Sequence, residues 1–165
     1  MDGAFFLPGI DWATDVACER GLCDMQLRDC AGGVVFCGEK VFLLKNEKGE
    51  WVMPKGIIRD ALTAEETAVQ SVRAEGGIAG RILDSAGRTY YEFYSITRQR
   101  PVCNRVAWFV MQADSEEYRI GEPEKVTEAG FYPVAEAVGM ITYSQDRSLL
   151  TQSYRKYFEK TGRAD

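Results

Sequence analysis

Acidic side chains near the middle of the chain are the groups best placed to do chemistry. Histidine is absent, so histidine triads and histidine metal sites are excluded, and a general base must be a carboxylate, lysine, tyrosine or cysteine. Residues 63–75 form the clearest predicted helix, and positions four apart on a helix project from one face. That face offers Glu75 and the hydroxyl of Ser71. A carboxylate there could act as an acid or base or bind a hard cation; the alternative for Glu75 is a solvated side chain near the end of the helix.

Basic residues in predicted loops could bind an anionic ligand. Lys55 and Gly56 follow a short apolar run, and Arg98 and Arg100 lie in an apparent loop between two strands. Since ammonium and guanidinium groups bind phosphates, Lys55, Arg98 and Arg100 are predicted ligand-binding residues, with Gly56 included as the neighbour of Lys55. The alternative for each basic side chain is a solvated surface. The run Tyr90–Tyr94 alternates faces along a strand, where one ring could stack on a nucleobase or pack in the core.

The first half of the chain contains a predicted strand pair. The apolar runs Cys30–Cys37 and Val41–Leu44 flank a turn signal at Gly38, which predicts one buried strand and its return. Trp51–Met53 reads as a short strand that Pro54 stops, because proline cannot donate to a sheet.

The helix that carries Glu75 has clear start and stop signals. Thr63 and Glu66 have the spacing of a capping box, in which each side chain bonds to the backbone of the other residue. Alanine or valine recurs every four residues along the helix, which gives one apolar stripe. Gly76 and Gly77 end it.

The second half adds strands and then helices. Strands are predicted at Arg81–Leu83, Thr89–Tyr94, Val102–Gln112 and Ala129–Pro133, and helices at Val134–Met140 and Gln145–Lys160. This order favours an α+β sandwich over a regular alternation of strand and helix. We expect an N-terminal extension at residues 1–26, with a short helix at Asp11–Arg20, and one domain at residues 27–165.

Composition narrows the possible partners. The chain has 165 residues, which fits one domain, and its formal charge is −5, which argues against a binder of duplex nucleic acid. We predict no membrane span and no secretion signal, and therefore a cytoplasmic protein. There are five cysteines, and an odd number argues against a disulfide framework. No two of them have the tight Cys-x-x-Cys spacing of zinc modules. They are interpreted as small packed hydrophobic residues rather than as a zinc site.

Between Gly56 and Ile78 the chain resembles the Nudix hydrolase family. The family's box reads Gly, five residues, Glu, seven residues, Arg-Glu, an aliphatic residue, any residue, Glu-Glu, any residue, Gly and an aliphatic residue. This chain aligns to it without a gap, with matches at Gly56, Val72, Glu75, Gly77 and Ile78. The segments Ala31–Val35 and Trp51–Gly56 also resemble the family. The resemblance covers about residues 28–160 and implies a Nudix-type α/β/α sandwich with a mixed β-sheet, an α+β fold.

Most acidic positions of the box differ from the family pattern. Leu62 replaces the first Glu, Gln70 and Ser71 replace the Arg-Glu pair, and Ala74 replaces the first acid of the Glu-Glu pair. The resemblance implies hydrolysis of a nucleoside diphosphate derivative, with Mg²⁺ held by carboxylates. The resemblance makes Glu75 the residual catalytic and metal-binding residue, so Mg²⁺ would be weakly held. We therefore predict weak or absent hydrolysis, and a nucleotide-type ligand-binding or regulatory role.

Two alternatives remain open at this point. A working Mg-dependent pyrophosphohydrolase would combine Glu75 with acids outside the box. Asp60 lies near the missing first Glu and is interpreted as a loop residue; the other acids are Glu92, Glu116, Glu117, Glu124 and Glu128. A protein-interaction scaffold, for example a homodimer, would use the apolar residues of the extension at residues 1–26 against a partner or against its own domain.

Overall fold

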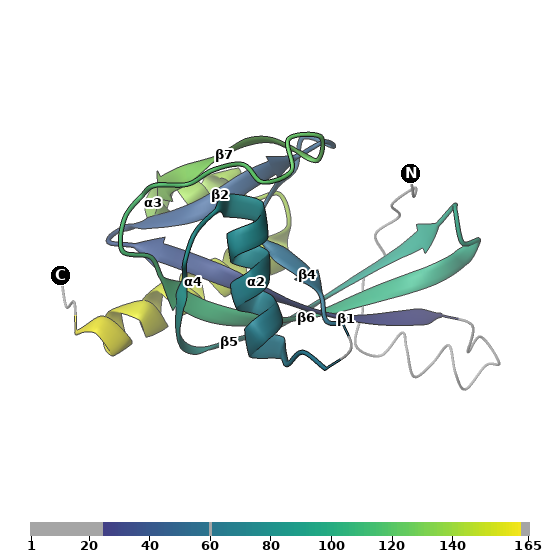
Figure 1. The fold of residues 1–165 in the computed structure, drawn as a ribbon, viewed down its shortest axis with the longest axis horizontal. Coiled ribbons are helices and arrows are strands. Elements are labelled where there is room, and N and C mark those ends of the chain that lie inside the picture. Colours follow the sequence, from purple (N-terminus) through teal and green to yellow (C-terminus); the bar gives the residue numbers. More distant parts are fainter. Residues whose placement is uncertain (1–24, 60, 163–165) are drawn as a thin grey trace.

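The computed structural model describes residues 25–59 and 61–162, which form a seven-stranded β-sheet with helices on both faces (Figure 1). The strands are β1 (Gln26–Cys37), β2 (Lys40–Asn46), β3 (Trp51–Val52), β4 (Lys55–Ile57), β5 (Arg81–Ser95), β6 (Arg100–Gln112) and β7 (Val126–Pro133). The helices are α2 (Ala64–Gly76), α3 (Val134–Met140) and α4 (Ser144–Thr161). None of these helices has the length and apolar character needed to cross a membrane. The helix predicted at Asp11–Arg20 lies outside the described residues.

Strand β1 is the centre of the sheet. It pairs in parallel with β6 along residues 26–36, and it pairs antiparallel with β2 at one end and with β4 at Cys30–Gly32. Strand β2 also pairs with β3 and β7, and β6 pairs with β5. The predicted mixed sheet is therefore confirmed.

The two faces of β1 build two separate cores. Successive side chains of a strand point to opposite faces, and residues 30–36 are buried without a break. Val35 packs with Val72 of α2 on one face. On the other face Phe36 stacks on Tyr157 of α4, with ring centres 4.8 Å apart. Since a strand buried on both faces needs cover on both sides, the arrangement is an α/β/α sandwich, as the sequence predicted.

The largest difference from the predicted elements is the length of β5. The runs Arg81–Leu83 and Thr89–Tyr94, predicted as two strands, belong to one strand that continues through Gly87. The register against β6 shifts between Ile82 and Asp84 and again between Ser85 and Gly87, so bulges carry the strand through a segment that has no strand pattern of its own. Pairing with β6, rather than local composition, therefore determines that β5 is one continuous strand.

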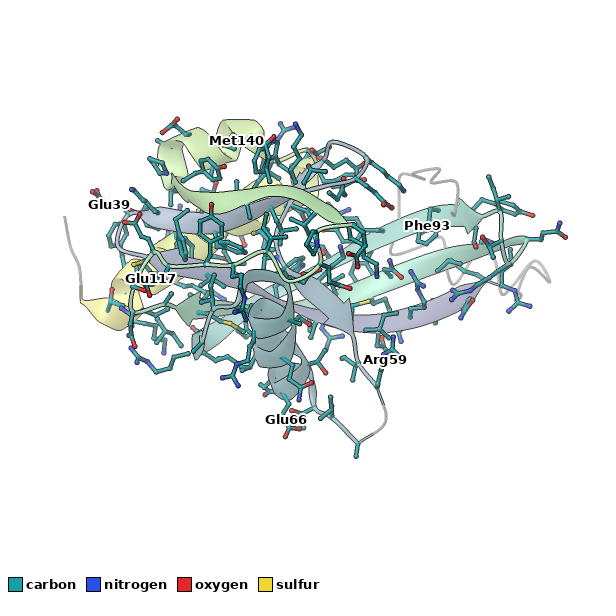
Figure 2. The ribbon with its side chains drawn as sticks, turned by 45° about the horizontal axis from the view of Figure 1, so that its top comes forward. Glu39, Arg59, Glu66, Phe93, Glu117 and Met140 are labelled. Atoms are coloured by element: carbon teal, nitrogen blue, oxygen red, sulfur yellow. The ribbon has the colours of Figure 1, made fainter. Side chains whose placement is uncertain are left out.

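Helix α2 begins and ends as the sequence predicted. Thr63 Oγ1 accepts from the Glu66 backbone N–H at 3.1 Å, and Glu66 Oε1 accepts from the Thr63 N–H at 2.9 Å. Gly77 ends the helix in a left-handed conformation with φ of 65°, a region that favours glycine. Figure 2 shows Glu66 near the N-terminal end of α2, away from the sheet. Both caps are local, which is why sequence alone identified this helix.

Replacing the N-terminal cap should weaken α2. The change Thr63→Ala removes the hydroxyl acceptor of the capping box, so we expect it to lower the free energy of unfolding by about 1 kcal/mol and the Tm by about 2–4 °C. Thermal unfolding followed by circular dichroism measures this. Ser148→Ala, at an exposed position of α4, is the matched control. Equal Tm values for the two variants would contradict the capping role.

Candidate functional site

Two adjoining cavities lie beside the C-terminal end of α2, and together they are named the α2 cleft. The larger has a volume of about 640 Å³ and the smaller of about 220 Å³. Their shared lining comes from the β2–β3 loop, the start of β4 and the segment before β7: Asn46, Glu47, Lys48, Val52, Met53, Lys55 and Lys125. Residues 46–55 therefore meet the sequence-distant Lys125 at this cleft.

Glu75 lines the smaller cavity at the end of α2. Its Oε1 atom accepts the backbone N–H of Lys55 at 3.0 Å, which ties the helix to β4. Burial raises the pKa of Glu75 to about 7, and the nearby Lys55 charge and backbone N–H oppose that rise. Glu75 is thus both a structural acceptor and an acid that faces the cleft.

Ser71 lies one turn before Glu75 and faces the same strand. Its Oγ atom donates to the Thr67 carbonyl at 2.8 Å. A side chain added at Gly56 would place its Cβ atom 2.5 Å from that Oγ. The backbone of β4 at Gly56 therefore passes so close to Ser71 that a larger residue at position 56 would collide with the serine hydroxyl.

The donor set at α2 does not fit a magnesium site. Ser71 uses its proton on the helix backbone, Ala74 has no oxygen in its side chain, and one oxygen of Glu75 already accepts from Lys55. Within residues 25–59 and 61–162, no group of three or more acidic or sulfur side chains is arranged to hold a metal ion. Magnesium prefers six oxygen ligands, of which carboxylates supply the charge. Asp60 lies outside the described residues.

The segment between β6 and β7 is docked on the end of α2. Gly121 N–H donates to the Glu75 carbonyl at 3.2 Å, and Arg119 N–H donates to the Gly76 carbonyl at 2.8 Å. A Cβ atom at Gly121 would lie 1.7 Å from the Ala74 carbonyl oxygen, so any side chain there would push the segment away. This docking places Lys125 at the smaller cavity. Sequence analysis missed Lys125, because nothing local marks the segment as part of a site.

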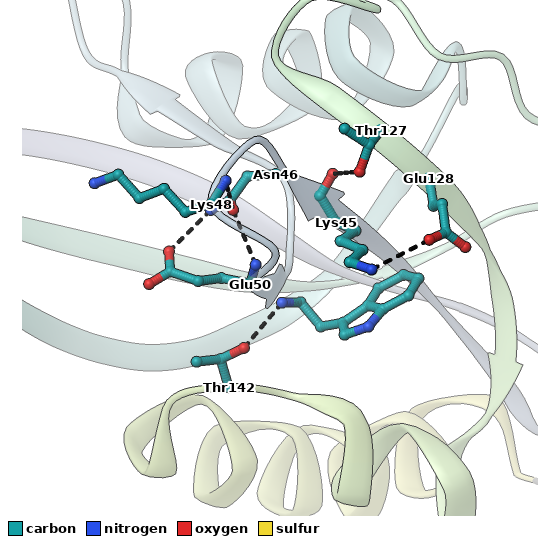
Figure 3. A network of polar contacts seen from close by, with 8 residues as sticks. Lys45, Asn46, Lys48, Glu50, Thr127, Glu128 and Thr142 are labelled. Atoms are coloured by element: carbon teal, nitrogen blue, oxygen red, sulfur yellow. Dashed lines mark hydrogen bonds and ion pairs between the residues drawn. The ribbon is translucent and has the colours of Figure 1, made fainter. Parts of the chain in front are cut away.

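The β2–β3 loop forms the opposite wall and is held by Asn46 (Figure 3). The Asn46 side-chain oxygen accepts from the backbone N–H groups of Lys48 and Glu50 at 2.9 and 3.0 Å. Its amide donates to Glu50 at 3.0 Å, and Glu50 in turn accepts from the Tyr143 hydroxyl at 2.5 Å. The loop that carries Lys48 is therefore fixed to the start of α4.

The larger cavity is aromatic and acidic. Asp146 is 2% exposed and accepts from the Tyr91 hydroxyl. Burial raises the pKa of Asp146, and the Tyr91 hydrogen bond and the Lys55 charge oppose that rise. Lys55 Nζ lies 5.8 Å from the centre of the Tyr91 ring, and Trp108 closes the cavity with its indole N–H bonded to Thr89 at 2.7 Å. Sequence analysis missed Asp146; its one signal is an acid at the start of an amphipathic helix.

The predicted ligand-binding residues divide into two groups. Lys55 lines both cavities, whereas Gly56 lies against Ser71 of α2 and is not part of their lining. Arg98 lies in the exposed turn between β5 and β6, and Arg100 is the exposed first residue of β6. Figure 2 labels Phe93 on β5, the strand that leads into this turn. Neither arginine lines the cleft, and the Arg98 guanidinium donates to Gln26 at 3.3 Å. Their contact with a ligand stays a prediction.

Of the acids outside the box that the sequence suggested, Glu92 lines the larger cavity, and Glu116, Glu117, Glu124 and Glu128 line neither cavity. Glu116 pairs with Lys40 at 3.1 Å, and Glu128 pairs with Lys45 at 3.3 Å, both at the surface (Figure 3 shows the second pair). Glu92 is 1% exposed, and neither of its carboxylate oxygens has a hydrogen-bond partner. Glu117 and Glu124 are exposed.

Comparison with known proteins places this geometry in a family. The NUDIX domain family model matches residues 26–159. The MutT4 protein of Mycobacterium tuberculosis is 34% identical over 99 residues, which are 60% of this chain and 39% of that protein. The chain thus spans well under half of the length of that relative.

Solved structures show the same fold. The MutT NUDIX hydrolase of Burkholderia pseudomallei superposes with a TM-score of 0.59 at 19% identity, over 77% of this chain and 98% of that one. The dihydroneopterin triphosphate pyrophosphohydrolase of E. coli superposes with a TM-score of 0.64 at 16% identity, over 77% and 96% of the two chains. At these identities the likeness shows the fold alone, and it confirms the Nudix-type sandwich.

The raised pKa of Glu75 should appear in the stability of the protein. The folded-state pKa of about 7 lies above the ordinary value of 4.5 for a glutamate in an unfolded chain, so the folded state keeps a proton that the unfolded state loses. Stability from this group is present below pH 4.5 and is lost as pH rises through 7. Glu75→Gln keeps an acceptor for Lys55 without the charge, so we expect it to be more stable than wild type at about pH 8, by on the order of 2 kcal/mol.

Urea unfolding of both proteins across this pH range measures the difference. It should vanish at about pH 4, where Glu75 is protonated in both states. Glu159→Gln, on the exposed face of α4, is the control and should show no such trend. A difference that is constant with pH would contradict the buried charge as its cause.

Proposed function

This chain belongs to the NUDIX family, and from that premise we propose that it binds a nucleoside diphosphate-type ligand in the α2 cleft and hydrolyses it weakly or not at all. The donor set at α2 is the observation that carries the proposal. Hydrolases of this family cleave a diphosphate by attack of water. Divalent metal ions bound by carboxylate side chains offset the negative charge of the diphosphate. Here Ser71 and Ala74 stand where two of those carboxylates are expected.

The energetic consequence is large. Each 1.4 kcal/mol added to a barrier slows a reaction about tenfold, and a metal ion supplies several kcal/mol of charge stabilisation. Glu75 alone cannot supply the charge of several acids, and its Oε1 atom already accepts from Lys55. Loss of metal therefore removes the means of activating water, while it leaves the shape of the cleft intact.

The two cavities support a ligand with an organic end and an anionic end. The larger cavity has a volume within the usual range for small-molecule sites, and it presents the rings of Tyr91, Phe93 and Trp108. The smaller cavity presents Lys48, Lys55 and Lys125. The same three lysines also line the larger cavity, whereas no aromatic side chain of the described residues lines the smaller one. A nucleoside therefore fits the larger cavity, and its phosphates fit beside the lysines where the two cavities adjoin.

A binding and turnover panel tests the proposal. Isothermal calorimetry with nucleoside diphosphates and their sugar derivatives should show binding of at least one compound. Turnover of the same compounds at high Mg²⁺ or Mn²⁺ should stay below about 0.01 s⁻¹, against the median of about 10 s⁻¹ for enzymes. Turnover at ordinary enzyme rates that Glu75→Gln abolishes would instead establish the alternative, a working magnesium-dependent hydrolase.

Adding a carboxylate beside Glu75 should improve metal binding. Ala74 is exposed, so Ala74→Glu introduces a second acid next to Glu75 without filling a packed core. We expect the affinity for Mn²⁺ to rise about tenfold, because each added carboxylate contributes charge to a hard cation. Electron paramagnetic resonance of free Mn²⁺ measures it. Ala135→Glu, exposed on α3, is the matched control; an equal gain there would show a nonspecific effect of charge.

A further inference from the structure

Three lysines from separate segments converge on the α2 cleft. Lys48 comes from the β2–β3 loop, Lys55 from β4 and Lys125 from the segment before β7, and all three line both cavities. Among the other described lysines, Lys40 and Lys45 pair with surface acids at 3.1 and 3.3 Å, and Lys156 donates to the Ser85 carbonyl at 2.8 Å. Among the described residues, no ion pair involves the ammonium groups of Lys48 and Lys55, whereas Lys125 has an exposed pair with its neighbour Glu122 at 3.5 Å.

The backbone of each of these lysines is fixed by the fold. Asn46 accepts from the Lys48 N–H at 2.9 Å, and Glu75 accepts from the Lys55 N–H at 3.0 Å. The Lys125 N–H donates to the Glu122 carbonyl at 2.9 Å, in the segment that Gly121 docks on α2. These bonds fix where each lysine side chain starts, so all three ammonium groups stay within reach of the cleft.

The charge balance of the smaller cavity is cationic. Its charged lining is Lys48, Lys55 and Lys125 against Glu47 and Glu75, although the whole chain carries a net charge of −5. The larger cavity has the reverse balance, with Glu47, Glu50, Glu92 and Asp146 against the same three lysines. A site that recruits metal ions needs carboxylates in excess, so the smaller cavity is the one suited to an anion. Ammonium groups neutralise phosphate oxygens directly as point charges, without any bound ion.

We propose that Lys48, Lys55 and Lys125 hold the diphosphate of the ligand in place of metal ions, so that binding at the α2 cleft requires no divalent cation. This inference rests on the proposed function, since it concerns the same cleft and the same class of ligand. Lys55 is the central group, because its ammonium lies over the Tyr91 ring of the larger cavity and its backbone bonds to Glu75 in the smaller one. It therefore stands at the junction between the organic and the anionic ends of the ligand.

Calorimetry in the presence of a chelator tests the inference, with ADP and inorganic pyrophosphate as the probes. Both should bind in EDTA, and added Mg²⁺ should not tighten the binding. Lys55→Gln and Lys125→Gln should each weaken it about tenfold, the loss expected for one charge-assisted contact. Binding should also weaken as ionic strength rises. Lys160→Gln, exposed on α4 and away from both cavities, should bind as wild type does.

Lys48→Gln is included as a variant that should not disturb the fold, in case one of the other two variants misfolds. Lys48 is exposed in its loop, and its backbone N–H bond to Asn46 does not depend on its side chain, so an unchanged Tm with weakened binding would support the inference. Binding of ADP that requires Mg²⁺ and is insensitive to all three lysine variants would overturn it while leaving the proposed function in place. Failure of every panel compound to bind, with or without Mg²⁺, would overturn both.

Discussion

The hydrogen bond from the Lys55 backbone N–H to Glu75 is the contact on which the α2 cleft depends. It joins the end of α2 to β4, and β4 is in turn paired with the central strand β1. The carbonyl of Glu75 receives Gly121 from the segment before β7. One residue at the end of a helix thus holds a strand through its side chain and a loop through its backbone, and the walls of the cleft meet there.

This contact limits what Glu75 can do for chemistry. A carboxylate that accepts a backbone N–H has fewer lone pairs left for a cation, and its burial disfavours the charged form. The neighbouring positions supply no replacement, because Ser71 bonds within its own helix and Ala74 is apolar. The chain therefore has the Nudix fold, but the oxygen atoms that Ser71 and Glu75 offer on α2 fit a magnesium ion poorly.

Lysine side chains and bound metal ions can both offset the negative charge of phosphates, but they differ in their effect on water. A metal ion also lowers the pKa of a coordinated water and positions it for attack. An ammonium group gives affinity without that activation. This difference is the basis of the proposal that Lys48, Lys55 and Lys125 hold a diphosphate in the cleft and that the chain cleaves it weakly or not at all.

The sequence by itself determined the elements that have local signals and the family to which they belong. The capping box at Thr63, the glycine end at Gly77 and the apolar run of β1 are short-range patterns, so the helix that carries Glu75 was predicted almost to the residue. Tertiary structure alone decided the continuity of β5, which depends on pairing with β6. It also decided the membership of the site: Lys125 and Asp146 reach the cleft through loop docking and helix packing, long-range contacts that no local pattern encodes.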